Sequence, residues 1–209
     1  MRKFGLIAGL VAGLGVAEVA QATDYNGYEI PKYTVLQSDG SIELRQYAPH
    51  IVAEVTVTGS RRDAANTGFR LLAGYIFGGN TSSDKLAMTA PVTQAASEKI
   101  NMTAPVTQIQ SGDTWTIRFM MPSTYTLDTL PKPNSDTVQL RVVDPGTRLV
   151  MQFSGRAMAG NKMASYEDRL RSYANTNNIP VTGPAEAAYY DDPFTLPWKR
   201  RNEVSLAVK

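Results

Sequence analysis

The chain has 209 residues, of which 43% are hydrophobic, and this length suffices for one compact domain with its own core. The formal net charge is only +2 and the basic residues are spread along the chain, so no nucleic-acid partner is expected. The absence of cysteine excludes disulfides, thiol catalysis and thiolate metal sites.

The first residues have the pattern of a secretory signal. Met1-Arg2-Lys3 is positively charged, 4–17 is apolar, and Ala20-Gln21-Ala22 has the small-x-small pattern of a cleavage site. We therefore predict a signal peptide at 1–22, export to the periplasm or secretion, and one mature domain at 23–209 without a stable membrane span. The alternative is an uncleaved anchor, although the apolar stretch ends at Glu18, short of the roughly 20 residues that span a bilayer.

Alternating and β-branched runs predict three strands at the start of the mature chain. Residues 33–36 and 42–47 are separated by the turn-forming sequence 38–41, which indicates a hairpin. The stretch 51–58 is rich enough in valine and threonine to be the third strand.

Two later segments have helical periodicity. A capping pattern formed by Ser60 and Asp63 and the terminating pair Gly78-Gly79 predict a helix over 60–77. Its core-facing residues are expected to be Ala65, Phe69, Leu72 and Ile76. A second helix is predicted over 161–177, with Met163, Tyr166, Leu170 and Tyr173 on one side.

Further strands complete an α+β pattern. They are predicted at 85–94, 99–109, 114–121, 137–143, 148–154, 187–191 and 203–208. Along the chain, strands therefore precede and follow each helix. This order indicates two similar halves in one antiparallel sheet system or distorted barrel. Residues 85–94 also resemble 99–108, both containing Met-Thr-Ala-Pro-Val, and we interpret this repeat as the two arms of a hairpin.

Several short motifs occur in the order seen in the SOUL heme-binding family, which this chain resembles over roughly 33–206. They are Tyr33-Thr34-Val35, Glu43-Leu44-Arg45-Gln46-Tyr47, Gly68-Phe69-Arg70, Tyr75-Ile76-Phe77-Gly78-Gly79-Asn80, the duplicated Met-Thr-Ala-Pro-Val, Phe119-Met120-Met121-Pro122, Leu130-Pro131-Lys132-Pro133, Phe153-Ser154-Gly155, Pro193-Phe194-Thr195-Leu196-Pro197 and Arg200-Arg201-Asn202-Glu203-Val204. The joint order of these motifs carries the resemblance.

The resemblance implies a distorted antiparallel β-barrel with two helices and two pseudo-symmetric halves, related to effector-binding domains of gyrase-inhibitor type. It also implies a shallow apolar groove beside a helix, which holds heme or a metal-free porphyrin reversibly and without a covalent bond. On the first helix we place this groove at Arg70, Leu71, Gly74 and Tyr75, the outward stripe next to the core-facing one. The arginine would pair with a propionate. The alternative is an ordinary solvated helix face.

His50 is the only histidine and therefore the candidate imidazole ligand for heme iron, whereas Met88 and Met102, which could supply thioether ligands, are more simply explained as core residues. In family members with a proposed axial histidine, the matching position is Gln46 here, and His50 lies four residues further on beside Pro49. A solvated loop histidine is the competing interpretation. The sequence thus favours the helix stripe over His50 as the main ligand contact.

Three functions follow from these observations. The first is non-catalytic binding of heme or a related tetrapyrrole, as an extracytoplasmic carrier, buffer or scavenger. The second is a binding module for other hydrophobic or amphipathic small molecules, because a fold does not fix its ligand. The third is a hydrolase, against which the chain has no G-x-S-x-G or H-E-x-x-H motif and a single histidine.

Overall fold

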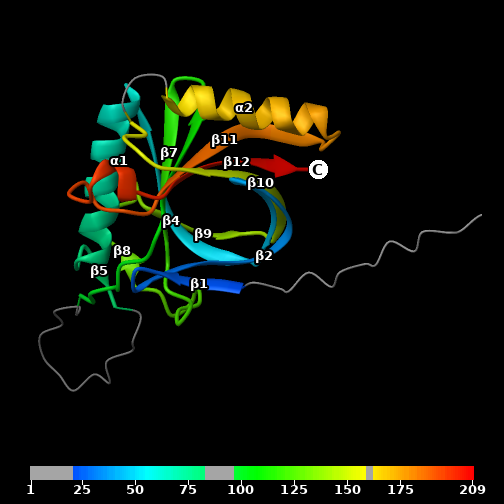
Figure 1. Ribbon diagram of the computed structural model, residues 1–209. Helices are drawn as coiled ribbons and strands as arrows, with labels where there is room; N and C mark the ends of the chain where they lie inside the picture. Colours follow the sequence, from blue (N-terminus) through cyan, green and yellow to red (C-terminus); the bar gives the residue numbers. More distant parts are fainter. Residues whose placement is uncertain (1–20, 83–96, 159–161) are drawn as a thin grey trace, which may run out of the picture.

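The computed structural model describes residues 21–82, 97–158 and 162–209, and Figure 1 shows their arrangement. The strands are β1 (Gln21–Tyr25), β2 (Tyr28–Asp39), β3 (Ile42–Tyr47), β4 (His50–Thr58), β5 (Asn80–Thr81), β6 (Val106–Ser111), β7 (Thr114–Met120), β8 (Lys132–Pro133), β9 (Gln139–Val143), β10 (Gly146–Phe153), β11 (Val181–Tyr189) and β12 (Asn202–Val208). The helices are α1 (Arg61–Ile76), α2 (Lys162–Thr176) and the short 3-10 helix η1 (Pro197–Lys199). The predicted α+β class is confirmed.

Ten strands form one antiparallel sheet in the order β1-β2-β3-β10-β12-β11-β6-β7-β4-β9. The sheet curves strongly without closing, and α1 and α2 lie on its outer side (Figure 1). It is therefore an open version of the distorted barrel expected from the sequence. Strands β5 and β8 pair separately.

The strand order has an internal two-fold pattern, which agrees with the expectation of two similar halves. Counting outward from the β11–β6 pair, β12 corresponds to β7, β10 to β4 and β3 to β9. Each half contains one helix packed on its own strands, α1 on β4 and β7, and α2 on β10, β11 and β12. Along the chain, one half consists of β3, β4, α1, β6 and β7, and the other of β9, β10, α2, β11 and β12. Strand β3 of the first half pairs with β10 of the second, and β9 of the second half pairs with β4 of the first. The two halves therefore share one continuous sheet.

Helix α1 begins and ends where its capping residues predict. Ser60 accepts a hydrogen bond from the backbone N–H of Asp63, and Gly78 follows the helix with a φ of 112°. The residues that face the sheet are Ala64, Ala65, Gly68, Leu72, Tyr75 and Ile76. Phe69 was predicted to face the core, but it is 46% exposed, with its ring in a T-shaped contact with Phe119 at a centroid distance of 5.3 Å.

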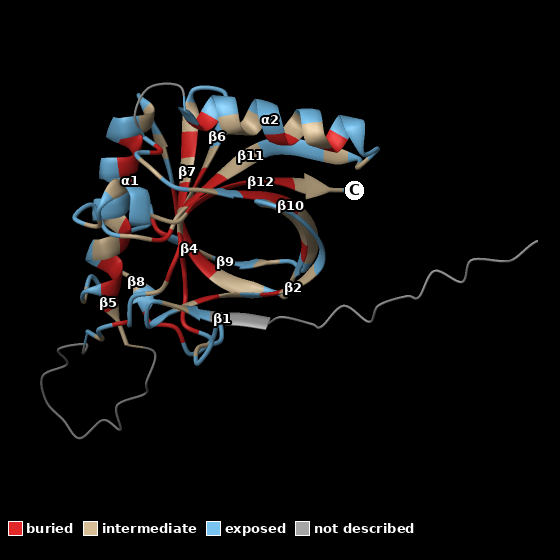
Figure 2. Ribbon diagram, in the orientation of Figure 1, coloured by how far each residue is buried: buried red, intermediate tan, exposed pale blue. Residues whose placement is uncertain are grey.

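Helix α2 covers the other half through Met163, Leu170 and Ala174, all buried, with Tyr166 and Tyr173 partly buried beside them. The predicted face is therefore confirmed. Figure 2 shows that both helices have a buried side towards the sheet and an exposed side towards solvent. Within the described ranges, neither helix is sufficiently long and apolar to cross a membrane.

Only the second arm of the predicted hairpin between 85–94 and 99–108 lies within the described ranges, and its first arm lies outside them. In the second arm only the part from Val106 onward is a strand. Both edges of β6 are occupied, by β7 and by β11. Residues 99–105 instead connect to other segments, since Ile100 N–H donates to Ile76 O and Ala104 N–H donates to Glu29 O.

Candidate functional site

The period-two alternation of the strands divides the sheet into a helix-covered face and a helix-free face. In β4, Ala53 and Val55 pack in the core beneath α1, so Val52 and Glu54 point to the opposite side. In β12, Val204 and Leu206 pack beneath α2, which turns Glu203 and Ser205 the other way. The helix-free face lies inside the curve of the sheet and carries several charged side chains.

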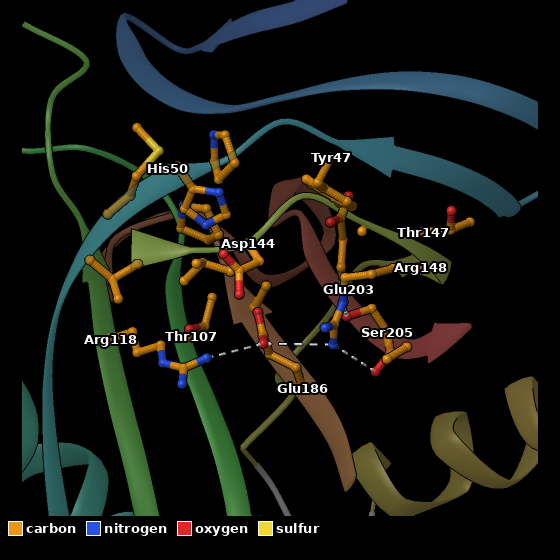
Figure 3. Close-up of a pocket in the computed structure, with 18 of the residues that line it drawn as sticks. Tyr47, His50, Thr107, Arg118, Asp144, Thr147, Arg148, Glu186, Glu203 and Ser205 are labelled. Carbon is orange, nitrogen blue, oxygen red and sulfur yellow. Dashed lines mark hydrogen bonds and ion pairs between the residues drawn. The ribbon is translucent and has the colours of Figure 1, made fainter. Parts of the chain in front are cut away.

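A cavity of about 260 Å³ opens on this inner face, where strands of both halves meet. Its polar wall includes Tyr47, His50, Arg118, Arg148, Glu186 and Glu203 (Figure 3). Val52, Met120 and Ala188 contribute apolar surface. A second hollow of about 270 Å³ shares Pro31, His50 and Met120 with the first, so His50 borders both spaces.

His50 is fixed by its own backbone. Its Nδ1 lies 3.1 Å from the carbonyl oxygen of Ala48, and since a carbonyl only accepts, Nδ1 is the protonated nitrogen of the neutral ring. Burial lowers the pKa of His50, which outweighs the raising effects of the Ala48 hydrogen bond and of the nearby Glu186. No described residue forms a hydrogen bond with Nε2. His50 is thus a neutral imidazole that can offer Nε2 to a ligand.

Glu186 lies between two arginines at the base of the cavity (Figure 3). Its Oε2 is 3.9 Å from Nη1 of Arg118 and 3.6 Å from Nη2 of Arg148. Both separations exceed hydrogen-bonding distance, so the pairs are loose. Arg118 is held more firmly by Glu54, 2.8 Å from its Nε, and Arg148 donates to Ser205 Oγ at 2.9 Å. The arginines are therefore positioned by partners other than Glu186.

A buried ionic cluster forms the wall beside Tyr47. Glu203 accepts from Arg45, from Arg201 and from the hydroxyl of Tyr190, at 3.0, 2.7 and 2.8 Å respectively. Burial, followed by the charge of Glu203, raises the pKa values of Tyr47 and Tyr190, so both phenols are protonated at neutral pH. This cluster satisfies itself internally and serves as a rigid wall.

Comparison with known proteins bears directly on this fold. The family model for the SOUL heme-binding protein matches residues 28–207. The chain belongs to the SOUL heme-binding family. Human Heme-binding protein 2 is 31% identical over 201 residues, which covers 93% of this chain and 92% of the human protein. Mouse Heme-binding protein 2 is 30% identical over 202 residues, covering 94% and 92%.

Solved structures share the SOUL fold at much lower identity. The C-terminal domain of EcmrR has a TM-score of 0.59 at 9% identity, covering 80% of this chain and 96% of that domain. A hydrolase from Listeria innocua has a TM-score of 0.53 at 14% identity, covering 83% of this chain and 94% of that one. These likenesses concern the fold alone.

The residues predicted to contact the SOUL ligand lie on two sides of the sheet. Arg70 and Gly74 are exposed and Leu71 is half-buried, all on α1 and outside the sheet, whereas His50 lies inside its curve. Tyr75 was predicted to face outward and is only 2% exposed, with its hydroxyl donating to Pro131 O at 2.8 Å. The cause is Gly68, where a Cβ would lie 2.4 Å from Ile117 Cγ1. Compared with the predicted orientation, α1 is therefore turned about its axis, so that Tyr75 faces the sheet and Phe69 does not.

Arg118, Arg148 and Glu186 were not identified from the sequence. For Arg118 alone the sequence contains a signal that could have identified it as a site residue: it stands between Ile117 and Phe119 in an otherwise apolar strand. A charge at such a position indicates a strand whose second face is polar or encloses a site. Among the residues described, no three His, Cys, Asp or Glu side chains gather in a way that could hold a metal ion, so His50 is a single potential ligand there.

Proposed function

We propose that the protein binds heme or a related tetrapyrrole reversibly in the cavity on the helix-free face, with His50 as the axial ligand. The observation that carries this proposal is the state of His50: its Nδ1–H is donated to Ala48 O, and burial lowers its pKa. Nε2 is therefore a lone-pair donor at neutral pH, which is the form of histidine that binds iron. Heme bound here would supply the iron and most of the apolar contact area.

The other cavity residues fit the remaining chemistry of such a ligand. Val52, Met120 and Ala188 offer apolar surface for part of a macrocycle, and each Å² buried contributes roughly 25 cal/mol before the costs of binding are subtracted. Arg118 and Arg148 can pair with propionate carboxylates. A porphyrin would extend from the cavity into the adjoining hollow, since each space alone is at or below the roughly 300 Å³ lower limit of ordinary ligand pockets.

We infer that the role is that of a non-catalytic carrier, buffer or scavenger outside the cytoplasm. Membership of the SOUL heme-binding family supports the binding part of this role. The secretory pattern of 1–22 supports the location, and cleavage after Ala22 would make Thr23 the first residue of the exported protein. The mass of the exported protein tests this, and an intact Met1 would contradict it.

Absorbance titrations with hemin and with metal-free protoporphyrin test the binding site. We expect His50→Ala to change the Soret band and to weaken hemin binding by about tenfold, which corresponds to roughly 1.4 kcal/mol. Protoporphyrin binding should change little, because it has no iron to ligate. Arg70→Glu, on α1, serves as the matched comparison and should leave both titrations unchanged. A larger loss from Arg70→Glu than from His50→Ala would place the ligand beside α1 instead.

A second candidate ligand is an amphipathic cation. Glu186 favours it, since this carboxylate lines the cavity and is only loosely paired with Arg118 and Arg148. The two candidates require opposite responses to the loss of the Glu186 charge, so one substitution separates them.

A further inference from the structure

The loop between β11 and β12 holds three large apolar side chains in solvent. Phe194 is 95% exposed, Trp198 is 69% exposed and Leu196 is 47% exposed. They alternate along the chain within five positions, with η1 at the end of the run. Isolated exposed apolar residues are ordinary, whereas three large ones within five positions of one loop point to an interaction surface.

This loop is held in a definite shape by its own hydrogen bonds. Arg200 donates from Nη2 to Pro193 O at 2.6 Å and from Nε to Thr195 O at 2.8 Å. The Asp192 carboxylate accepts from the backbone N–H of Phe194 at 2.6 Å and of Thr195 at 3.0 Å. The backbone of the loop is therefore already ordered, so little backbone conformational entropy is lost when its apolar side chains are covered.

A connection to the body of the protein fixes the loop as a whole. Gly155 N–H donates to Pro197 O at 2.8 Å, and Asn202 Nδ2 donates to Gly155 O at 3.1 Å. The Asp191 carboxylate accepts from Arg201 N–H at 2.7 Å and from the Tyr25 hydroxyl at 3.1 Å. These contacts anchor the base of the loop, while Phe194 and Trp198 remain at its outside.

One cation of the loop, Lys199, is directed to solvent, whereas Arg200 donates within the loop and Arg201 pairs with Glu203. Lys199 is exposed, and within the described ranges it forms no salt bridge. The Asp191 carboxylate is partly buried against Arg201 N–H, and the exposed Asp192 carboxylate accepts from Phe194 N–H and Thr195 N–H within the loop. Lys199 thus lies next to Trp198 as a cation available to an external anion.

We propose that this loop, Asp191–Arg201, docks the protein on an anionic membrane surface. Phenylalanine and leucine would enter the acyl boundary, Trp198 would occupy the interfacial layer that its amphipathic ring favours, and Lys199 would contact lipid phosphates. The proposal does not depend on which ligand the cavity binds.

The fluorescence of Trp198 can be used to test whether the loop enters the membrane. The chain has two tryptophans, and Trp115 is only 8% exposed with its indole N–H donating to Gly59 O. Lipids with brominated acyl chains quench only a tryptophan that reaches them. The full chain should co-sediment with vesicles of equal parts phosphatidylcholine and phosphatidylglycerol, and its fluorescence should fall when the phosphatidylcholine is brominated. Trp198→Phe should abolish this quenching.

Matched variants identify the contacts. Phe194→Ser should weaken partition into these vesicles by about tenfold or more, since a buried phenylalanine ring is lost. Lys199→Glu should weaken it by about tenfold at low salt, with a smaller effect at high salt. Leu127→Ser is the control, because Leu127 is 44% exposed on the turn that follows β7 and lies outside the loop.

Three results would overturn the proposal. One is vesicle binding without quenching of Trp198, which would indicate attachment through another segment such as the apolar stretch 4–17. Another is an equal loss in Leu127→Ser, which would indicate non-specific adhesion. The third is an absence of vesicle binding together with self-association that Phe194→Ser removes, which would make the loop an interface between copies of this chain.

Discussion

Arg45 and Glu203 form an ion pair across the sheet, with Nη1 of the arginine 3.0 Å from Oε1 of the carboxylate, although 158 residues separate them in the sequence. The exposed fractions of their side chains are 2% and 3%. Strand β10 lies between β3 and β12, so the arginine reaches over a neighbouring strand. Glu203 also accepts from Arg201, and Arg45 pairs with Glu43 at 2.6 Å, so two guanidinium groups share the buried Glu203 and Arg45 has a second carboxylate.

We expect Glu203→Gln to lower the free energy of unfolding by about 3 kcal/mol, since Arg201 would lose its carboxylate partner and the buried Arg45 would keep only the partly exposed Glu43. Urea unfolding followed by circular dichroism measures this loss. Glu167→Gln is the control: Glu167 pairs with Arg171 at 2.8 Å on the exposed side of α2, and its loss should cost under about 0.5 kcal/mol. Equal effects of the two substitutions would show that the buried cluster does not stabilise the fold.

The two glycines of α1 should respond to alanine in opposite directions. Gly68→Ala should destabilise the protein by about 1–3 kcal/mol, because its Cβ would lie 2.4 Å from the side chain of Ile117. Gly74→Ala should stabilise it by about 0.5–1 kcal/mol, since nothing lies within 4 Å of that Cβ and alanine is the better helix former. Thermal unfolding of both variants measures the difference. A stable Gly68→Ala variant would contradict the close approach of α1 to β7.

Local sequence signals predicted most of the helices and strands, but they did not predict which side of α1 faces the sheet. The Ser60 cap and Gly78 set the ends of α1 within one residue because capping is a local interaction. The orientation of Phe69 and Tyr75 depends on the close approach of Gly68 to Ile117, which lies 49 positions away. The periodicity of residues within the helix cannot predict such a long-range contact. The N-terminal half of β11 was missed because Gly183 and Pro184, which disfavour strands, lie at an irregularity in its pairing with β12.

The candidate site was less predictable than the fold for the same reason. Arg118, Arg148 and Glu186 come from β7, β10 and β11, and only the sheet order and the curve bring them together. His50 was identified by its chemistry as the single histidine. The orientation of its ring depends on the Ala48 carbonyl, which the sequence alone did not indicate.

The depressed pKa of His50 should make stability depend on pH. Above about pH 6.5 the ring is neutral in both folded and unfolded chains, and it contributes no pH dependence. Below that value the unfolded chain takes up the proton while burial keeps the folded ring neutral, so the free energy of unfolding falls as the pH decreases. His50→Gln should remove this component. Urea unfolding of both proteins between about pH 7.5 and pH 5.5 tests it, and identical slopes would show that burial does not perturb His50.

Glu186→Gln should strengthen hemin binding several-fold and weaken the binding of a lipophilic cationic dye. The physical reason is that Glu186 lies 3.9 Å from Arg118 and 3.6 Å from Arg148, so its removal leaves Arg148 without a carboxylate partner, and Arg118 with Glu54 alone, among the described residues. A propionate then gains about 1 kcal/mol from the two cations in a partly desolvated cavity. Asp144→Asn removes an equal charge from an exposed residue of the same cavity that forms no ion pair within the described ranges, so it controls for net charge. Parallel titrations of the three proteins measure both ligands. If Glu186→Gln instead weakens hemin and Asp144→Asn has no effect, the carboxylate contributes to heme binding and the two arginines do not receive the propionates.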